Sequence, residues 1–547
     1  MALPRTARRR AGQRIVADRA VFDECHGSEA LAKLHDAFLR TTVCGLEDLP
    51  RYLDLDPADI EFVLRQVCYG SISRREQFNR RLISAVAMGR PVVAGLPPRW
   101  RAALREQGFT VAGRRSAIRW GAQATLNLGH GIAKYLMHIL RMMQPSERRR
   151  ANGAAGPTAY LHAIAAENLP IGLPDLPATD VVSWLEQHTD LLEGIDTVAS
   201  RVEAPVSLTR GGRAAVGAAH PLAVPTGSRA TLQFLWTGGA ILVKALWRLL
   251  RGEWSSAMLA AMLVDAALLR STQGHGQAAI HLFNTSTFAK RPLWTLIAPQ
   301  FGMRSLCYHY STNSESILGH SGTADEDLAD SWRLCWWDEQ FVWDSRQAAF
   351  LSGAAERPSK ARAVGPVSFV ATTRHLPAEA NGALAVFDVT PVSVTRRATR
   401  VNDVYYTREL VEAFILDLAE AASSHGLVVA WKTKRKVEDV HDSAYRPFRE
   451  RMKDYPGAVI VNPRVSAQQL IAASFAAVSI PFTSTALIAH AAGKPSTFYD
   501  PSGAVRPDHP AGRGLPMLSS KDALLAWLSS IVSNGAGQSS SARFEPS

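Results

Sequence analysis

A regular alternation of short apolar segments with helical segments constrains the fold of the second half of the chain, from about Gly382 onward. Uninterrupted apolar strands that alternate with helices are typical of a parallel sheet covered on both faces. In such sheets ligands bind at the carboxyl ends of the strands. The predicted strands are Leu384–Val389, Leu427–Trp431, Ala458–Val461, Ala476–Ile480 and Thr497–Tyr499, and the predicted helices lie near Thr407–Ser423, Ser443–Lys453, Ser466–Ser474, Thr485–Ala492 and Lys521–Ser533.

The first half of the chain predicts a second α/β domain. At 547 residues the protein is too long for one hydrophobic core, because cores stop growing near about 250–300 residues. The segment Arg90–Gly95 is followed by a helix around Arg99–Gln107 and a strand at Phe109–Ala112, which is an α/β order. We expect a basic flexible N-terminus over residues 1–20, an N-terminal α/β domain over 21–365 with helical insertions, a C-terminal domain over 380–533, and a disordered Ser/Gly-rich tail over 534–547.

The charge balance favours polyanionic partners. Lys and Arg total 61 against 49 acidic residues, which gives a net charge of +12. Nucleic acid, anionic lipid and nucleotide substrates are the candidates. The basic residues do not form a stripe with interleaved aromatic residues, so we expect no nucleic-acid partner. Five scattered cysteines without a Cys-x-x-Cys pair predict neither a disulfide framework nor a zinc site and favour the cytoplasm, as does the absence of an apolar signal segment after the Arg-rich start.

Two amphipathic stretches raise the question of membrane contact, although no tract has the roughly 20 uncharged residues of a transmembrane helix. Thr231–Arg251 places Lys244, Arg248 and Arg251 on one helical face and Leu235, Leu242, Leu246, Leu249 and Leu250 on the other. Ile132–Met143 places Lys134, His138 and Arg141 opposite Ile132, Leu136, Ile139, Leu140 and Met143. Both stretches suit helices lying on an anionic membrane. They also suit helices that pack on a domain core, and this alternative stays open.

The segment Ser479–Ala486 carries the strongest indication of a ligand site. It lies where a predicted strand ends and a helix begins, and Thr483 or Ser484 is the natural N-cap residue. Free backbone N–H groups at a helix start, the positive end of the helix dipole and the hydroxyls of Thr483, Ser484 and Thr485 together make a phosphate site without a glycine loop. The alternative is a structural helix cap.

Other predicted strand ends place polar side chains at the same edge of the sheet. Lys432 and Arg435 could pair with a nucleotide phosphate, although a solvated loop would look the same. The remaining candidates are Asp388, the pair Asn462 and Pro463, and the turn that contains Tyr499, Asp500 and Ser502. Asp500 or Ser502 could meet a ribose or base edge, or could belong to an ordinary surface turn.

An aromatic-rich region between His275 and Trp343 suits a sugar-binding surface, because aromatic rings stack on sugar faces while amides and hydroxyls bind the sugar hydroxyls. Its candidate acceptor-binding residues are Trp294, Tyr310 and Asn313. An interdomain core that holds many tryptophans is the alternative.

These residues resemble the bacterial polysaccharide biosynthesis proteins named for their PFTS motif, present here as Pro481, Phe482, Thr483 and Ser484. The likeness extends to Phe387–Pro391, Trp431–Arg435, Gly493–Pro495, Tyr499–Pro501, Arg291–Thr295 and Tyr310–Asn313, roughly the second half of the chain. The resemblance implies a glycosyltransferase of lipopolysaccharide or capsule synthesis with two Rossmann-like domains facing a cleft, the GT-B arrangement. It also implies a relation to transferases that use CMP-activated Kdo or sialic acid, with Ser484 and Thr485 holding the CMP phosphate. Asn462-Pro463 stands where those transferases carry a His-Pro motif.

Such a transferase would bind a nucleotide-sugar donor and a glycan or lipid-linked acceptor. Helix termini and basic side chains can stabilise a leaving phosphate without a metal ion, so neither a metal nor a cofactor is expected. His309, Glu315 and Asp338 in the N-terminal domain, and Asp388, are the candidate catalytic bases. A non-catalytic glycan-binding assembly or export protein is one alternative. Another nucleotide-dependent α/β enzyme, such as a sugar epimerase, is a second, which the lack of an early Gly-x-Gly-x-x-Gly turn disfavours.

Overall fold

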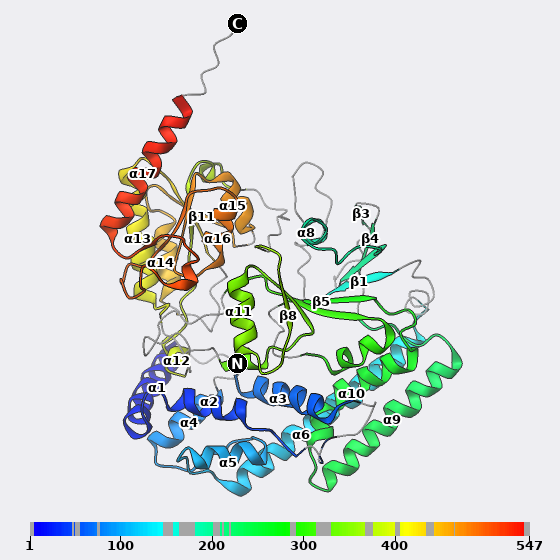
Figure 1. The fold of residues 1–547 in the computed structure, drawn as a ribbon. Coiled ribbons are helices and arrows are strands. Elements are labelled where there is room, and N and C mark those ends of the chain that lie inside the picture. Colours follow the sequence, from blue (N-terminus) through cyan, green and yellow to red (C-terminus); the bar gives the residue numbers. More distant parts are fainter. Residues whose placement is uncertain are drawn as a thin grey trace.

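The computed structural model contains two sheets and a layer of long helices (Figure 1). It describes residues 5–45, 47, 49, 55–73, 77–145, 157–162, 181–200, 208–210, 213–217, 220–284, 291–312, 330–366, 376–399, 405–433, 442, 444–463 and 465–540.

The C-terminal sheet has six parallel strands in the order β11-β10-β9-β12-β13-β14. Its strands are β9 (Leu384–Phe387), β10 (Val429–Lys432), β11 (Ala458–Val461), β12 (Ala476–Ser479), β13 (Ser496–Tyr499) and β14 (Met517–Leu518), and its helices are α12 (Val394–Ala398), α13 (Arg408–Ser424), α14 (Tyr445–Met452), α15 (Ala467–Ala473), α16 (Ser484–Ala491) and α17 (Lys521–Ser540). All five predicted strands are confirmed to within two residues at each end. The strand order reverses between β9 and β12, and this reversal is the topological switch point where such sheets bind ligands.

The N-terminal sheet repeats this pattern with eight strands in the order β3-β4-β2-β1-β5-β6-β7-β8. They are β1 (Thr158–Leu161), β2 (Thr197–Ser200), β3 (Leu208–Arg210), β4 (Arg213–Gly217), β5 (Ile280–Asn284), β6 (Arg304–Tyr308), β7 (Glu339–Val342) and β8 (Lys360–Ala363), with helices α8 (Val181–His188) and α11 (Ser345–Ala354). Only β3 runs antiparallel to its neighbour. The order reverses between β1 and β5, so the predicted fold class, an α/β protein with two Rossmann-like domains, is confirmed.

The helices along the lower part of Figure 1 form a separate layer. They are α1 (Arg5–His26), α2 (Ala30–Arg40), α3 (Pro57–Ser73), α4 (Gln77–Ala87), α5 (Pro98–Glu106), α6 (Gly113–Met143), α9 (Ser228–Leu250) and α10 (Ser255–Thr272). Helix α10 is buried on nearly every side and packs against α3, α6 and α9. The predicted unit around α5 exists, but its two strands reduce to one parallel bridge between Val92 and Val111 outside both sheets.

Three expectations differ from the structure at these helices. Helix α1 covers most of the segment predicted to be flexible, because Ile15 and Phe22 are buried against the helical layer. Helix α17 continues to Ser540, into the predicted tail. The stretch Ile132–Met143 is the end of α6, which precedes the first strand and is therefore no insertion in the sheet, whereas α9 and α10 do connect β4 to β5. The boundaries of the two domains stay predictions.

Glycine at position 131 allows α6 and α10 to cross closely. A Cβ built at Gly131 would lie 2.6 Å from the Cβ of Ala260 and 3.0 Å from its backbone carbon. We expect Gly131→Ala to lower the free energy of unfolding by about 1–2 kcal/mol, because overpacking costs about 1–3 kcal/mol and the better helix propensity of alanine offsets less than about 1 kcal/mol. Gly129→Ala on the same helix meets nothing within 4 Å and should stabilise slightly. Urea unfolding of both variants tests this, and equal effects would contradict the close crossing.

Candidate functional site

The site is built where β9 and β12 lie side by side at the switch point. The two strands are in parallel register, with Ser479 opposite Phe387. The backbone N–H of Ile480 then donates to the carbonyl oxygen of Phe387 at 3.1 Å, so the strands stay paired to their carboxyl ends. Asp388 leaves β9 and the segment from Pro481 leaves β12 at this edge. The switch point, where such sheets bind ligands, therefore has Asp388 on one side and the PFTS residues on the other.

The PFTS turn has an unusual backbone. Phe482 has a φ of +60°, in the left-handed region that non-glycine residues rarely adopt. Its ring is held 4.5 Å from that of His509 and 5.8 Å from that of Phe498, and the hydroxyl of Tyr406 donates to the carbonyl oxygen of Pro481 at 2.7 Å. Residues in such conformations persist only when their surroundings hold them, and they cluster at ligand sites.

The hydroxyls after this turn leave the start of α16 without a side-chain cap. Thr483 occupies the N-cap position, yet its side chain makes no capping hydrogen bond; it donates to the carbonyl oxygen of Ile480 at 3.1 Å instead. The hydroxyl of Thr485 lies 2.8 Å from that of Ser479 and 3.2 Å from that of Thr483. An uncapped helix start with adjacent hydroxyls is an arrangement that binds phosphate.

The N-terminal domain approaches the same helix start. The hydroxyl of Ser484 donates to that of Ser311, which follows β6, at 3.3 Å. The side chain of Gln347 supports the Ser311 loop through a 2.9 Å hydrogen bond to its carbonyl oxygen, and an ion pair between Arg513 and Asp344 joins the domains nearby. Ser484 and Thr485 are half-buried. The start of α16 therefore lies at the junction of the two domains. Sequence reasoning had assigned no role to Ser311, Gln347 or Arg513.

Two predicted donor contacts lie at neighbouring strand ends. Lys432 is the last residue of β10, and its Nζ donates to the carbonyl oxygen of Pro463 at 3.2 Å. Asn462 is exposed immediately after β11. Both stay candidates for contact with the nucleotide. Arg435 lies outside the described residues.

The polar side chains at the turn after β13 form hydrogen bonds within the domain, and this corrects the predicted nucleotide contacts of Tyr499, Asp500 and Ser502. Tyr499 is 1% exposed, and its hydroxyl donates to the carboxylate of Asp417 on α13 at 2.6 Å; burial, with Asp417 beside it, raises the pKa of this phenol. The carboxylate of Asp500 accepts from the N–H and hydroxyl of Ser502 at 3.0 and 2.6 Å and from the N–H of Val505 at 2.8 Å. Because the carboxylate and the Ser502 hydroxyl bind each other, this turn offers little to a ribose.

The aromatic region of the N-terminal domain is mainly core, which is the alternative left open above. Trp294 is 2% exposed, with its ring 4.6 Å from that of His281, so its predicted role in acceptor binding is wrong. Trp332, Trp336, Trp337 and Trp343 are buried as well. Tyr310 is 46% exposed just beyond β6 and stays a candidate acceptor contact. Asn313 lies outside the described residues.

The predicted bases differ in how the structure places them. Asp338 precedes β7, at the amino edge of the sheet, and accepts two hydrogen bonds from Arg291 at 3.1 and 2.6 Å, so it lies at the wrong edge for this role. His309 follows β6 at the carboxyl edge but is fully buried, with Nε2 2.8 Å from the side-chain oxygen of Gln340. Burial lowers its pKa to about 4. Glu315 lies outside the described residues.

Asp388, the fourth candidate base, is at the switch point. It is 3% exposed and accepts a short hydrogen bond from the hydroxyl of Tyr445. Burial, with the Asp388 charge beside it, raises the pKa of that phenol well above its usual value. The neutral phenol therefore donates at neutral pH and orients the carboxylate at the switch point.

Sequence reasoning missed His162, which occupies the equivalent switch point of the N-terminal sheet. It follows β1 directly, and its backbone N–H donates to the carbonyl oxygen of Leu282 on β5 at 2.8 Å. Its Nε2 lies 3.1 Å from Nδ1 of His281, and its ring stacks on Phe283 at 3.8 Å. Burial and the neighbouring His281 and His220 hold the pKa of His162 well below its usual value, so its imidazole is neutral at pH 7.

Comparison with known proteins points to one family. The family model described as polysaccharide biosynthesis PFTS motif protein matches residues 232–528, more than half of the chain. No curated protein sequence matches the chain.

Solved structures match the chain only with low similarity. A trehalose-6-phosphate synthase is 10% identical with a TM-score of 0.35, over 69% of this chain and 91% of that one. The glycotransferase of kitacinnamycin is 12% identical with a TM-score of 0.33, over 70% and 92%. The UDP-GlcNAc 2-epimerase of Methanocaldococcus jannaschii, in complex with UDP-GlcNAc and UDP, is 9% identical with a TM-score of 0.33, over 68% and 92%. Scores this low assign no shared activity.

Proposed function

Because the chain belongs to the polysaccharide biosynthesis PFTS motif proteins, we propose that it is a glycosyltransferase that moves a sugar from a nucleotide donor to a glycan acceptor. The observation that carries the proposal is the uncapped start of α16, which lies at a topological switch point and beside a loop of the other domain. A phosphate bound there would meet free amide hydrogens, the positive end of the helix dipole and the hydroxyls of Ser484 and Thr485.

This arrangement supports the departure of the nucleotide. In the transfer step the acceptor hydroxyl attacks the anomeric carbon, the bond from that carbon to the phosphate oxygen breaks, and the nucleotide leaves with the electron pair. Hydrogen-bond donors fixed around the leaving phosphate stabilise the charge that develops on it. Lys432 and Asn462 would contact the nucleotide from the neighbouring strand ends. Asp388, oriented by Tyr445, would complete the site opposite the PFTS turn.

The acceptor hydroxyl must also lose a proton, and we infer that the N-terminal domain accepts it. The candidate bases are His162, which follows β1 at the N-terminal switch point, and His309, which follows β6, two strands away in the sheet. Tyr310 is a candidate contact for the acceptor. Enzymes gain about 10²–10⁴-fold in rate from a positioned base.

The proposed donor and acceptor are taken from the family resemblance. A CMP-activated acidic sugar such as Kdo or sialic acid is the proposed donor, and a lipopolysaccharide, capsule or other lipid-linked glycan is the proposed acceptor. We propose a cytoplasmic location at the inner membrane, where such an acceptor would be reached. The described cysteines are free thiols, which suits a reducing compartment. No helix among the described residues is long and apolar enough to cross a bilayer.

A thermal-shift screen with CMP, UDP, GDP and their sugar conjugates tests the proposal, because a ligand that binds only the folded state raises the melting temperature by mass action. We expect one nucleotide and its sugar conjugate to stabilise the protein. His162→Gln should keep that shift while transfer of a radiolabelled sugar to membrane glycan falls by about 100-fold or more. Absence of any shift would favour the alternative of a glycan-binding assembly or export protein.

A further inference from the structure

The outward face of α6 is apolar along most of its length. Its exposed side chains from residue 121 to 143 are apolar or small apart from Thr125 and His130, and none is acidic, Lys or Arg. The large ones are far from buried, with 71% of Leu126, 62% of Leu140 and 69% of Met143 exposed. A soluble helix normally turns such a face to the core. This 31-residue helix instead presents it to the surroundings over about 30 Å.

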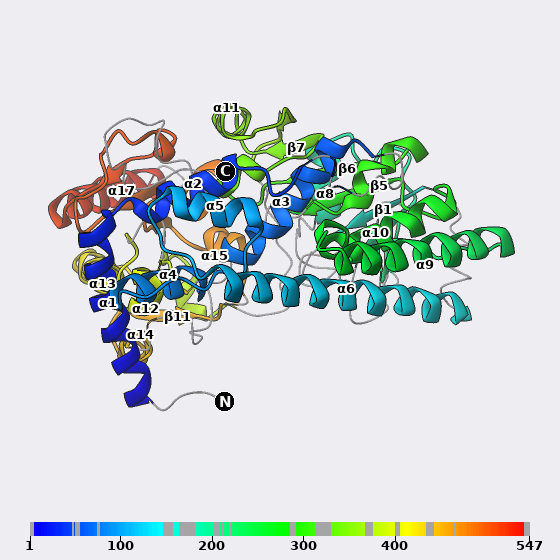
Figure 2. The ribbon, with the colours of Figure 1, turned by 90° about the horizontal axis from the view of Figure 1, so that it is seen from below.

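Helix α9 lies against α6 and presents a second apolar stripe. Trp236 is 80% exposed and Trp247 is 56% exposed. Leu232, Val243, Leu246 and Leu250 are exposed with them, at helical spacing on the same side. The hydroxyl of Tyr135 on α6 donates to the carbonyl oxygen of Leu235 on α9 at 2.8 Å, which ties the helices together. They run along the lower margin of the molecule in Figure 1, and Figure 2 shows them from that side.

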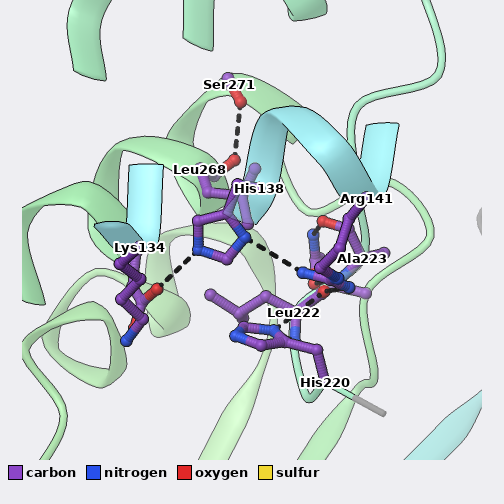
Figure 3. Close-up of polar contacts among 10 residues, drawn as sticks. Lys134, His138, Arg141, His220, Leu222, Ala223, Leu268 and Ser271 are labelled. Carbon is purple, nitrogen blue, oxygen red and sulfur yellow. Dashed lines mark hydrogen bonds and ion pairs between the residues drawn. The ribbon is translucent and has the colours of Figure 1, made fainter. Parts of the chain in front are cut away.

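The inward face of α6 explains why the apolar face stays outside. Lys134, His138 and Arg141, predicted to share one face of the helix, project into a largely buried cluster (Figure 3). Lys134 forms an ion pair with Asp265 of α10, and Nε2 of His138 lies 2.9 Å from the same carboxylate. Arg141 donates to the carbonyl oxygen of Leu222 at 2.8 Å and lies 3.1 Å from Nδ1 of His138. Rotating α6 to hide its apolar stripe would expose these partners.

The same cluster is a poor metal site. The ligand atoms of His138, His220 and Asp265 lie within 4.8 Å of one another, a spacing that would suit a divalent cation. Lys134 already pairs with the carboxylate and Arg141 with the imidazole of His138. Burial lowers the pKa of His138, and lowers that of His220 to about 3, so both imidazoles are neutral. A divalent ion would meet two fixed positive charges, so these contacts favour a role in holding α6 in place over a role in binding a metal.

The charges around the two stripes indicate what covers them. The sequences of α6 and α9 contain no Asp or Glu, whereas Arg114, Arg115, Arg119, Arg229 and Lys244 are exposed on them and Arg251 is exposed just beyond α9. A second copy of the chain placed here would bring like charges together. Exposed tryptophans and leucines flanked by Lys and Arg match the boundary of a bilayer with anionic headgroups.

We propose that the exposed faces of α6 and α9 form a membrane-docking surface that lies in the headgroup region of an anionic bilayer. The inference deepens the proposed function by naming the surface that would bring the site to a lipid-linked acceptor. It does not depend on that function, because the docking surface and the start of α16 share no residue. The apolar face predicted for α6 is the exposed one. The predicted face of α9 is corrected, because its outward side is Leu232, Trp236 and Val243 with Trp247, whereas Leu242 is buried.

Flotation of the full chain with vesicles of phosphatidylcholine alone or with about 30% phosphatidylglycerol tests the surface. We expect the protein to float with the anionic vesicles, less so at high salt because screening weakens the attraction. Leu140→Glu with Trp236→Glu should reduce the floating fraction at least 10-fold while leaving the nucleotide thermal shift unchanged. Leu416→Glu replaces a leucine that is 41% exposed on α13, and as the matched control it should float like the unaltered protein.

Two results would overturn the inference. One is a protein that stays at the bottom of the gradient with anionic vesicles. The other is a double variant that floats as well as the unaltered chain. Light scattering without lipid gives a further check: a dimer that the double variant converts to a monomer would assign the surface to self-association instead. The nucleotide shift reports separately on the proposed function, so failure of one proposal is distinguishable from failure of the other.

Discussion

Replacing Ser484 and Thr485 together by alanine is expected to weaken nucleotide binding by about 100-fold or more. Hydrogen bonds to charged groups contribute about 1.5–3 kcal/mol each, and two such bonds to a phosphate correspond to at least about 100-fold in affinity. Isothermal titration with CMP and with UDP measures the loss. The fold should survive, because both residues lie in the first turn of α16, where alanine is a good helix former.

Ser466 offers a matched control for this substitution. It is the N-cap of α15, its hydroxyl accepts from the N–H of Gln469 at 3.1 Å, and α15 follows β11 instead of a strand at the switch point. Ser466→Ala should lower the free energy of unfolding by about 1 kcal/mol through the lost cap and leave nucleotide affinity unchanged. The double variant should show the opposite pattern. Unchanged affinity in the double variant would remove the start of α16 from the donor site.

The C-terminal domain could be predicted from sequence because its information is local. Parallel strands buried on both faces are continuous apolar runs, and β11 was predicted to the residue. The position of the PFTS turn at a carboxyl edge follows from the same alternation. The strand order does not follow from it, and this order is what makes the edge between β9 and β12 a topological switch point. The backbone strain at Phe482 and the approach of Ser311 depend on contacts that no local pattern contains.

The N-terminal site and the faces of the long helices depend on pairs far apart in the chain. His162 becomes notable only because it lies beside His281, which is 119 residues later in the chain. The two meet because β1 and β5 are neighbours where the strand order of the sheet reverses. The charges of α6 gave no indication of burial, since charged side chains are rarely buried unless paired. The partner that permits their burial, Asp265, lies 127 residues beyond His138. The predicted ligand contact of Asp500 is wrong for a different reason. A turn whose side chains hydrogen-bond within the turn has the same composition as a turn whose side chains bind a ligand.

Asp265→Ala is expected to lower the free energy of unfolding of the N-terminal domain by about 3–5 kcal/mol, because removing one partner leaves buried charge uncompensated. Burial by itself would raise the pKa of Asp265, but the hydrogen bond from His138 and the charge of Lys134 outweigh it and lower that pKa. The carboxylate is thus charged at neutral pH and compensates the positive charges of Lys134 and Arg141 in the cluster. Asp265→Asn, which keeps an acceptor oxygen, should cost less.

Tryptophan fluorescence during urea unfolding measures this loss in the relevant domain, since eleven of the thirteen tryptophans precede residue 365. The ion pair between Arg248 and Glu253, at 2.6 Å with the carboxylate 40% exposed, supplies the control. Glu253→Ala should lower the free energy of unfolding by less than about 1 kcal/mol, because exposed ion pairs contribute little to stability. Similar losses for the two variants would mean that the buried cluster does not fix α6, and the apolar face of that helix would then be free to turn inward.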